Sequence, residues 1–189
     1  MPNSLLNQLL KRPNSLLSCD VDRSKENIMN DNYSRLIDES IEVELNVADL
    51  YLLFHSLFPQ DAKFWWQLIL EEKNHAALIK SIKKTSEQLG GLPNSLFASS
   101  LKDLKDINSK IISIIKKYKF KAPSRDEAFN IAFELEESAG ELHYQEFMVE
   151  KNSMEIDSIF KKLNANDKDH AKRIRSYMER HGIMFKPKI

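Results

Sequence analysis

The chain is short of the residues that most often interrupt regular structure. Among its 189 residues there are only 4 glycines and 6 prolines. A β-rich protein needs many turns, and glycine and proline are frequent in them. Their scarcity therefore favours long helices over a β-sandwich or barrel. The length is sufficient for one domain with its own hydrophobic core.

Cysteine is nearly absent as well, since Cys19 is the only one. This excludes a disulfide within the chain and a metal site built from cysteines alone. A single thiol fits a reducing compartment, so a cytoplasmic location is expected. The N-terminal stretch does not have a signal-peptide layout, because Lys11 and Arg12 follow its short apolar segment instead of preceding it.

Neither sign of charge is in excess. Lys and Arg total 28, Asp and Glu total 28, and the formal net charge is zero. Nothing in this balance indicates a nucleic-acid partner. No apolar run reaches the roughly 20 residues that a helix needs to cross a bilayer, so no membrane partner is expected either.

From Tyr33 onward, apolar residues recur at the spacing of helices. The pattern predicts helices over about 34–58, 61–89, 99–118, 124–149 and 153–180. The breaks fall at Pro59, at Gly90-Gly91 with Pro93, at Pro123 and at Gly182. The expected fold class is all-α, with four long helices in two antiparallel pairs and the helix at 99–118 in the crossover between them.

Residues 1–32 have a different composition, rich in Asn, Ser and Asp, and contain the sequence PNSLL twice. Asn-Ser after proline suits a turn that leads into a helix. The alternative is a short segment that docks on a partner through its leucines. The predicted organisation is a peripheral arm at 1–32, a helical bundle at 33–182 and a tail at 183–189.

Each of the four long helices carries an acidic residue within its apolar stripe. These residues are Glu44, Glu72, Glu136 and Asp167. His75 and His170 follow two of them at a spacing of three, which places an imidazole beside a carboxylate on one helix face. Buried carboxylates are costly and repel one another, and divalent cations among them would remove both penalties. Mixed oxygen and imidazole ligands suit iron or manganese, with zinc as an alternative.

These motifs resemble those of the rubrerythrin and ferritin-like di-iron family. The similar segments are IEVELNVADLY, FWWQLILEEKNHAALI, AFELEESAGELHY and LNANDKDHAKRI. The resemblance covers about residues 33–180, apart from 90–122, and implies a ferritin-like four-helix bundle that holds two iron ions. The implied ligands are Glu44, Glu72, His75, Glu136, Asp167 and His170. It also implies that Tyr51 and Tyr144 donate hydrogen bonds to ligating carboxylates.

The sequence departs from the family pattern in three ways. Asp167 stands where the family usually has glutamate, so it is either a shorter ligand or only an ion-pair partner. Glu137 lies seven residues before Tyr144, the spacing of Glu44 and Tyr51, so it competes with Glu136 as the third-helix ligand. The Cys-x-x-Cys pairs of a rubredoxin module are absent, and a redox reaction would therefore need a separate electron donor protein.

Three functions remain open at this point. The first is a di-iron oxidoreductase of the peroxidase or ferroxidase type, with peroxide or dioxygen as its small-molecule oxidant. The second is binding, storage or delivery of iron without turnover. The third is a metal-free interaction protein on the same fold. A monomer or homodimer is the expected assembly, because the sequence shows no signature of a storage cage.

Overall fold

The computed structural model describes residues 16–89, 101–144 and 169–186. Every regular element within these ranges is a helix. The elements are α1 (Leu16–Leu57), the 3-10 turn η1 (Pro59–Asp61), α2 (Ala62–Leu89), α3 (Leu101–Phe120), α4 (Arg125–Tyr144) and a helical segment at 169–180. The predicted all-α class is confirmed.

Two helix boundaries, the end of α1 and the start of α4, lie where the sequence predicts them. α1 stops at Leu57, and Phe58 before the proline has left the helical region with φ of −126°. At the start of α4, the Ser124 hydroxyl accepts a hydrogen bond from the Glu127 amide at 3.1 Å, as an N-cap does. Proline and capping side chains thus fix these boundaries locally.

Glycine ends the last helical segment. Gly182 has φ of +63°, a conformation that costs glycine little, and the Ile183 amide donates to the Met178 carbonyl at 2.9 Å. This bond closes the helix end as in a Schellman motif. The chain then turns back, and Ile183 is buried.

The first helix begins earlier than predicted. Its predicted start lies near Ser34, but α1 extends back to Leu16. Part of the predicted arm at 1–32 is therefore helical and continuous with the first helix of the predicted bundle, while the domain boundary itself stays a prediction. Asn, Ser and Asp lower helix propensity by only a few tenths of a kcal/mol each. A formed helix can extend through them because each added residue gains a hydrogen bond without a new nucleation step.

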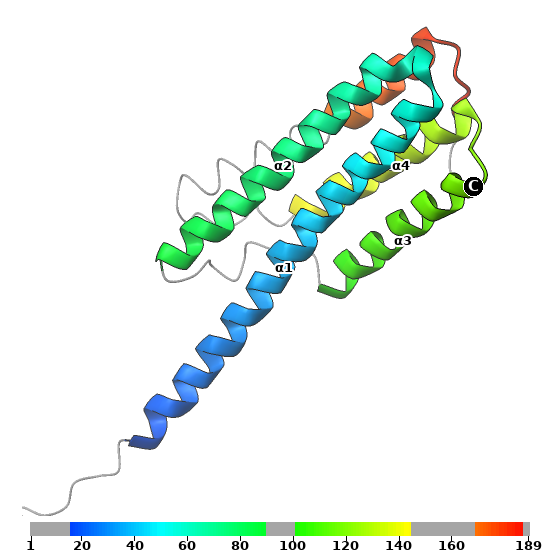
Figure 1. The fold of residues 1–189 in the computed structure, drawn as a ribbon. Helices are drawn as coiled ribbons and strands as arrows, with labels where there is room; N and C mark the ends of the chain where they lie inside the picture. The colour runs from blue at the N-terminus through cyan, green and yellow to red at the C-terminus, as the bar shows by residue number, and fades with distance from the viewer. Residues whose placement is uncertain (1–15, 90–100, 145–168, 187–189) are drawn as a thin grey trace, which may run out of the picture.

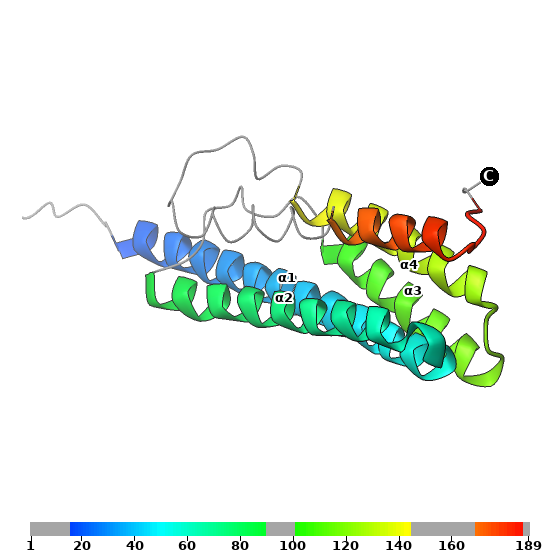
Figure 2. The same cartoon turned by 90° about the horizontal axis from the view of Figure 1, so that it is seen from above.

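The helices pack lengthwise on one another. α1 and α2 form an antiparallel pair joined by η1, and α3 lies against α1 (Figure 1). α4 and the segment 169–180 lie together on one side of this pair (Figure 2). The largest fully buried side chains are Trp65, Tyr51, Phe54 and Phe129. Within the described ranges, no helix is both long and apolar enough to cross a bilayer.

Asn108 on α3 holds the crossover helix to α1. Its side-chain carbonyl accepts a hydrogen bond from Asn46 at 2.8 Å. Its amide nitrogen donates to the Glu39 carboxylate at 2.9 Å and to the Glu39 carbonyl at 3.1 Å. Because Asn108 is buried and its bonds are directional, they fix the register of α3 on α1.

Asp61 joins three parts of the chain at one end of the helices. Its carboxylate is buried and accepts two hydrogen bonds from Arg125, at 2.7 and 2.8 Å. The Tyr177 hydroxyl donates a third at 2.9 Å. The Asp61 carboxylate of η1 therefore accepts hydrogen bonds from both α4 and the segment 169–180 and links these three elements.

We expect Asp61→Ala to lower the free energy of unfolding by about 3 kcal/mol, because it leaves Arg125 and Tyr177 without their shared acceptor. Chemical denaturation would measure the change. Asp106→Ala, at an exposed acid on α3, is the matched control and should change stability by no more than about 0.5 kcal/mol. Equal effects of the two substitutions would contradict the role of Asp61.

Candidate metal centre

Five of the predicted ligands come together between the helices. Glu44 comes from α1, Glu72 and His75 from α2, Glu136 from α4, and His170 from the segment 169–180. Their exposed fractions lie between 2% and 6%, so all five are buried. Each lies on the apolar face of its helix, which is why packing of the helices turns them inward.

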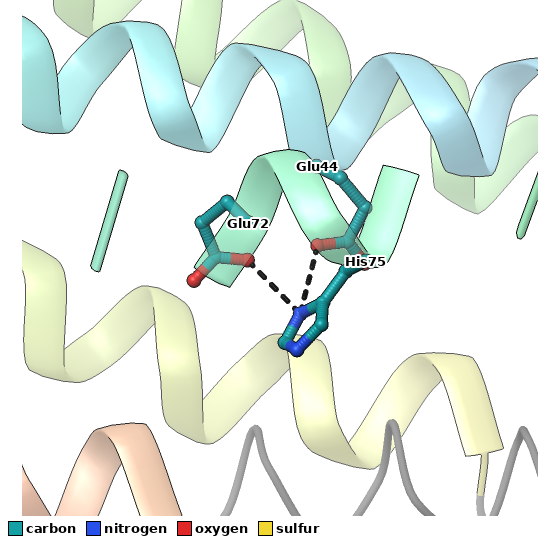
Figure 3. Close-up of side chains that lie close together, drawn as sticks. All are labelled: Glu44, Glu72 and His75. Carbon is teal, nitrogen blue, oxygen red and sulfur yellow. Dashed lines mark ion pairs between the residues drawn. The ribbon is translucent and has the colours of Figure 1, made fainter. Parts of the chain in front are cut away.

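Glu44, Glu72 and His75 form the first group (Figure 3). The His75 Nδ1 atom lies 3.3 Å from Glu72 Oε2 and 3.5 Å from Glu44 Oε2. The ligand atoms of the three residues all lie within 4.8 Å of one another. Two carboxylate oxygens and one imidazole nitrogen therefore face a common point.

Glu72, Glu136 and His170 form the second group. The His170 Nδ1 atom lies 2.9 Å from Glu72 Oε1 and 3.4 Å from Glu136 Oε2. Glu72 belongs to both groups and directs a different oxygen to each. The two imidazole rings lie nearly parallel, with centroids 5.3 Å apart.

Two atoms of this cluster have no hydrogen-bond partner among the described residues. Glu72 Oε1 and His170 Nδ1 are fully buried and lie 2.9 Å apart, yet their directions do not form a hydrogen bond with each other. A buried polar atom without a partner is costly. Atoms that converge without bonding to one another fit ligands of a metal ion, so the residues present are suited to hold one.

The protonation of the cluster reflects its crowding. Burial raises the pKa of Glu44 to about 7, and the nearby Glu72 carboxylate adds to this effect, although His75 opposes it. Burial alone would lower the pKa of His75, but Glu44 and Glu72 raise it to about 10. For His170, Glu136 and Glu72 outweigh burial in the same way and raise the pKa to about 11. Protons thus offset the carboxylate charge in the metal-free protein.

Tyr51 fixes one of the carboxylates. Its hydroxyl is buried and donates to Glu136 Oε1 at 2.5 Å. The other oxygen of Glu136 faces His170. The hydrogen bond that the resemblance implied for Tyr51 is therefore present, and it leaves one oxygen of Glu136 for a metal.

No family model, curated protein or solved structure matches this chain. The class of metal that suits this site is therefore inferred from its donor atoms. Carboxylate and imidazole donors in a buried cluster suit divalent first-row transition metals. The shared carboxylate of Glu72 suits two ions held side by side.

Glu71 contacts a candidate ligand, His170, and the sequence patterns did not predict this. Its Oε2 atom lies 3.1 Å from His170 Nε2, the ring nitrogen turned away from the cluster. Arg173 donates to both oxygens of Glu71. Burial would raise the pKa of Glu71, but Arg173, Gln67 and His170 hold it below its usual value. A carboxylate on the outer nitrogen orients a ligating histidine. The adjacent pair Glu71-Glu72, with Arg173 three residues after His170, was the available signal.

The remaining predicted residues have different outcomes. Glu137 is exposed while Glu136 is buried in the cluster, so of these two alternatives the structure brings only Glu136 to the other candidate ligands. Adjacent residues on a helix point about 100° apart, so only one of them can face the centre. Asp167 and the side chain of Tyr144 lie outside the described residues, and their roles stay predictions.

The metal-free protein should lose stability as the pH rises above neutrality. Because the folded pKa values of about 10 and 11 for His75 and His170 exceed the ordinary histidine value of 6.5, the folded state binds more protons than the unfolded state between these limits. The stability they contribute is complete below pH 6.5 and is lost as the pH approaches 10 to 11. Glu44 contributes in the same direction between 4.5 and about 7.

Thermal unfolding of chelator-treated protein, followed by circular dichroism, would test this. We expect the melting temperature to fall from pH 6.5 upward. The slope should flatten in a His75→Gln, His170→Gln double variant. A melting temperature of the parent that stays constant over this range would show that the imidazoles do not bind their protons tightly.

Proposed function

We propose that this chain is a dinuclear metal-binding protein of the ferritin-like type, with iron as the metal. The observation that supports this most directly is the position of Glu72. Its two oxygens belong to two different groups of buried ligand atoms, 2.9 Å from one imidazole and 3.3 Å from the other. A carboxylate placed in this way is suited to bridge two cations.

The arrangement of the helices supports the same proposal. Ligands come from α1, α2, α4 and the segment 169–180, whereas the site takes none from α3. The two residues from α2 have the i, i+3 spacing of a Glu-x-x-His motif. A ferritin-like bundle places single glutamates on two helices and such motifs on the other two.

Charge balance favours two divalent ions at this site. With neutral imidazoles, Glu44, Glu72 and Glu136 carry three negative charges among buried groups. Bound ferrous ions would supply electrons and Lewis acidity to peroxide or dioxygen. Tyr51 would hold Glu136 in place, and Glu71 would hold His170. The surrounding aromatic core would keep bulk water away from the reacting groups.

The proposed redox cycle needs an external reductant. The single cysteine excludes a rubredoxin-like iron site within this sequence. A separate electron donor protein would therefore restore the reduced state after each reaction with the oxidant.

Metal titration of the purified protein tests the binding proposal. We expect two ferrous or cobaltous ions per chain, one for each ligand group. Glu72→Ala should abolish both sites because it removes the shared ligand. Glu136→Ala should weaken the site that contains His170, whereas Glu137→Ala should bind as the parent does because Glu137 is exposed.

The adjacent pair Glu136 and Glu137 gives a control of equal chemistry and nearly equal position. Circular dichroism of each variant would establish that loss of binding is not loss of folding. A parent protein that binds no metal at micromolar concentrations would rule out the dinuclear centre. Equal binding by the two alanine variants would rule out this ligand assignment.

Rapid mixing of the ferrous-loaded protein with peroxide, and separately with dioxygen, tests the proposed reactivity. We expect absorbance changes of ferric iron to form faster than with the same concentration of free ferrous ion. Tyr51→Phe should lower the metal affinity by roughly 10- to 100-fold, since it removes a hydrogen bond to a ligating carboxylate. If the protein binds two ions but does not accelerate their oxidation, the metal-binding proposal stands and the redox function is ruled out.

A further inference from the structure

Large apolar side chains are exposed on the outer face of the α1–α2 pair. They are Leu45 and Leu52 on α1 and Trp66 and Leu70 on α2, with exposed fractions between 38% and 48%. They account for four of the eight large hydrophobic residues exposed in the described part of the chain. Clustered apolar exposure on a soluble protein marks a surface that binds something.

This outer face is turned away from the other helices. α4 and the segment 169–180 lie together on one side of the α1–α2 pair (Figure 2), and the four apolar side chains are exposed rather than packed against them. Leu52 illustrates the consequence. Its spacing places it in the apolar stripe of its helix, yet it is 42% exposed. The apolar stripe of α1 is therefore wider than the part that the other described helices cover.

The charges on this face are divided between the two helices. Glu42 and Asp49 are exposed on α1, and Lys73 and Lys80 are exposed on α2. The ion pairs found in the described part of the chain include none of these four. Together with the apolar residues they follow a spacing of three and four, at 42, 45, 49 and 52 on α1 and at 66, 70, 73, 77 and 80 on α2. This is the spacing of helices that pack lengthwise on other helices.

Two contacts fix which residues of α1 and α2 lie at the same level. The rings of His55 and Trp66 are 5.8 Å apart, and Asp38 pairs with Lys83 at 2.6 Å. Since the helices are antiparallel and rise equally per residue, residues between these contacts pair off in order. Asp49 therefore lies within about one residue of the level of Lys73, and Glu42 within about one residue of the level of Lys80.

We propose that two copies of this chain form a dimer through the outer face of the α1–α2 pair. A two-fold axis parallel to the helices would place α1 of each copy on α2 of the other, at the same level. Asp49 would then face the partner's Lys73. Glu42 would face the partner's Lys80. Leu52 would lie at the level of the partner's Leu70, and Leu45 would lie between the two charged contacts.

The charge pattern is what selects a second copy as the occupant. A two-fold rotation places the acidic row of each copy opposite the basic row of the other copy, at matching levels. The face is therefore complementary to itself, as an isologous interface requires. A partner of uniform charge would be repelled by one row while it was attracted by the other. Trp66 and the leucines would supply most of the binding free energy, and the charged rows would set register and specificity.

Sedimentation analysis of the full chain tests this proposal, and it does not depend on bound metal. We expect a dimer at micromolar concentrations. Trp66→Ala should raise the dissociation constant by about thirtyfold, because a large aromatic side chain that becomes buried in an interface is often a hot spot. Asp49→Lys and Lys73→Glu should each raise it by about tenfold or more, since each introduces like charges twice per dimer.

Mixing the two charge-reversed variants gives the decisive measurement. The Asp49→Lys chain and the Lys73→Glu chain each repel themselves, but their heterodimer restores opposite charges at both contacts. We therefore expect the mixture to dimerise with nearly the parent's dissociation constant. Charge effects confined to one chain cannot produce this rescue in trans.

Matched controls lie on α3, where Lys105 and Asp106 are exposed and away from the face. Lys105→Glu and Asp106→Lys make the same charge changes and should leave the dimer unaltered. A parent that remains monomeric at micromolar concentrations would overturn the proposal. So would charge-reversed variants that dimerise as the parent does, or a mixture that fails to recover dimerisation.

Discussion

The buried carboxylate of Glu72 is the group on which the interior of this protein depends. It has lost its water, and one of its oxygens has no hydrogen bond among the described residues. Its imidazole partners are His75 on its own helix and His170 on the segment 169–180, and the carboxylates of Glu44 and Glu136 lie beside it. A lone charge in this position would be expensive. The helices can therefore close around it only when protons or cations balance the acids that they bring together.

The rest of the core gives this cluster a fixed shape. Trp65 packs against Tyr51 with ring centroids 5.6 Å apart and against Phe129 at 4.4 Å. Phe129 in turn stacks on Tyr177 at 5.4 Å. A continuous aromatic layer thus runs from the hydroxyl that bonds Glu136 to the hydroxyl that bonds Asp61. Large, closely packed rings have little room to move, so this layer holds the candidate ligands in fixed positions.

The α1–α2 pair has two different faces. Its inner face carries Glu44, Glu72 and His75 among buried apolar residues. Its outer face carries exposed leucines and a tryptophan, with acids along one helix and lysines along the other. A helix that is apolar on two sides needs two partners. Among the residues that the structure describes, partners are present on the inner face only.

The sequence by itself determined the helical class and identified Glu44, Glu72, His75 and His170 as inward-facing. Both follow from local periodicity, because spacing along one helix reports which side chains share a face. Periodicity does not report what lies opposite that face. Only the tertiary structure distinguished Glu136 from Glu137, recruited Glu71 to His170, and gave Asp61 its partners Arg125 and Tyr177. Those choices depend on contacts between residues 64 to 116 positions apart, which no local pattern encodes.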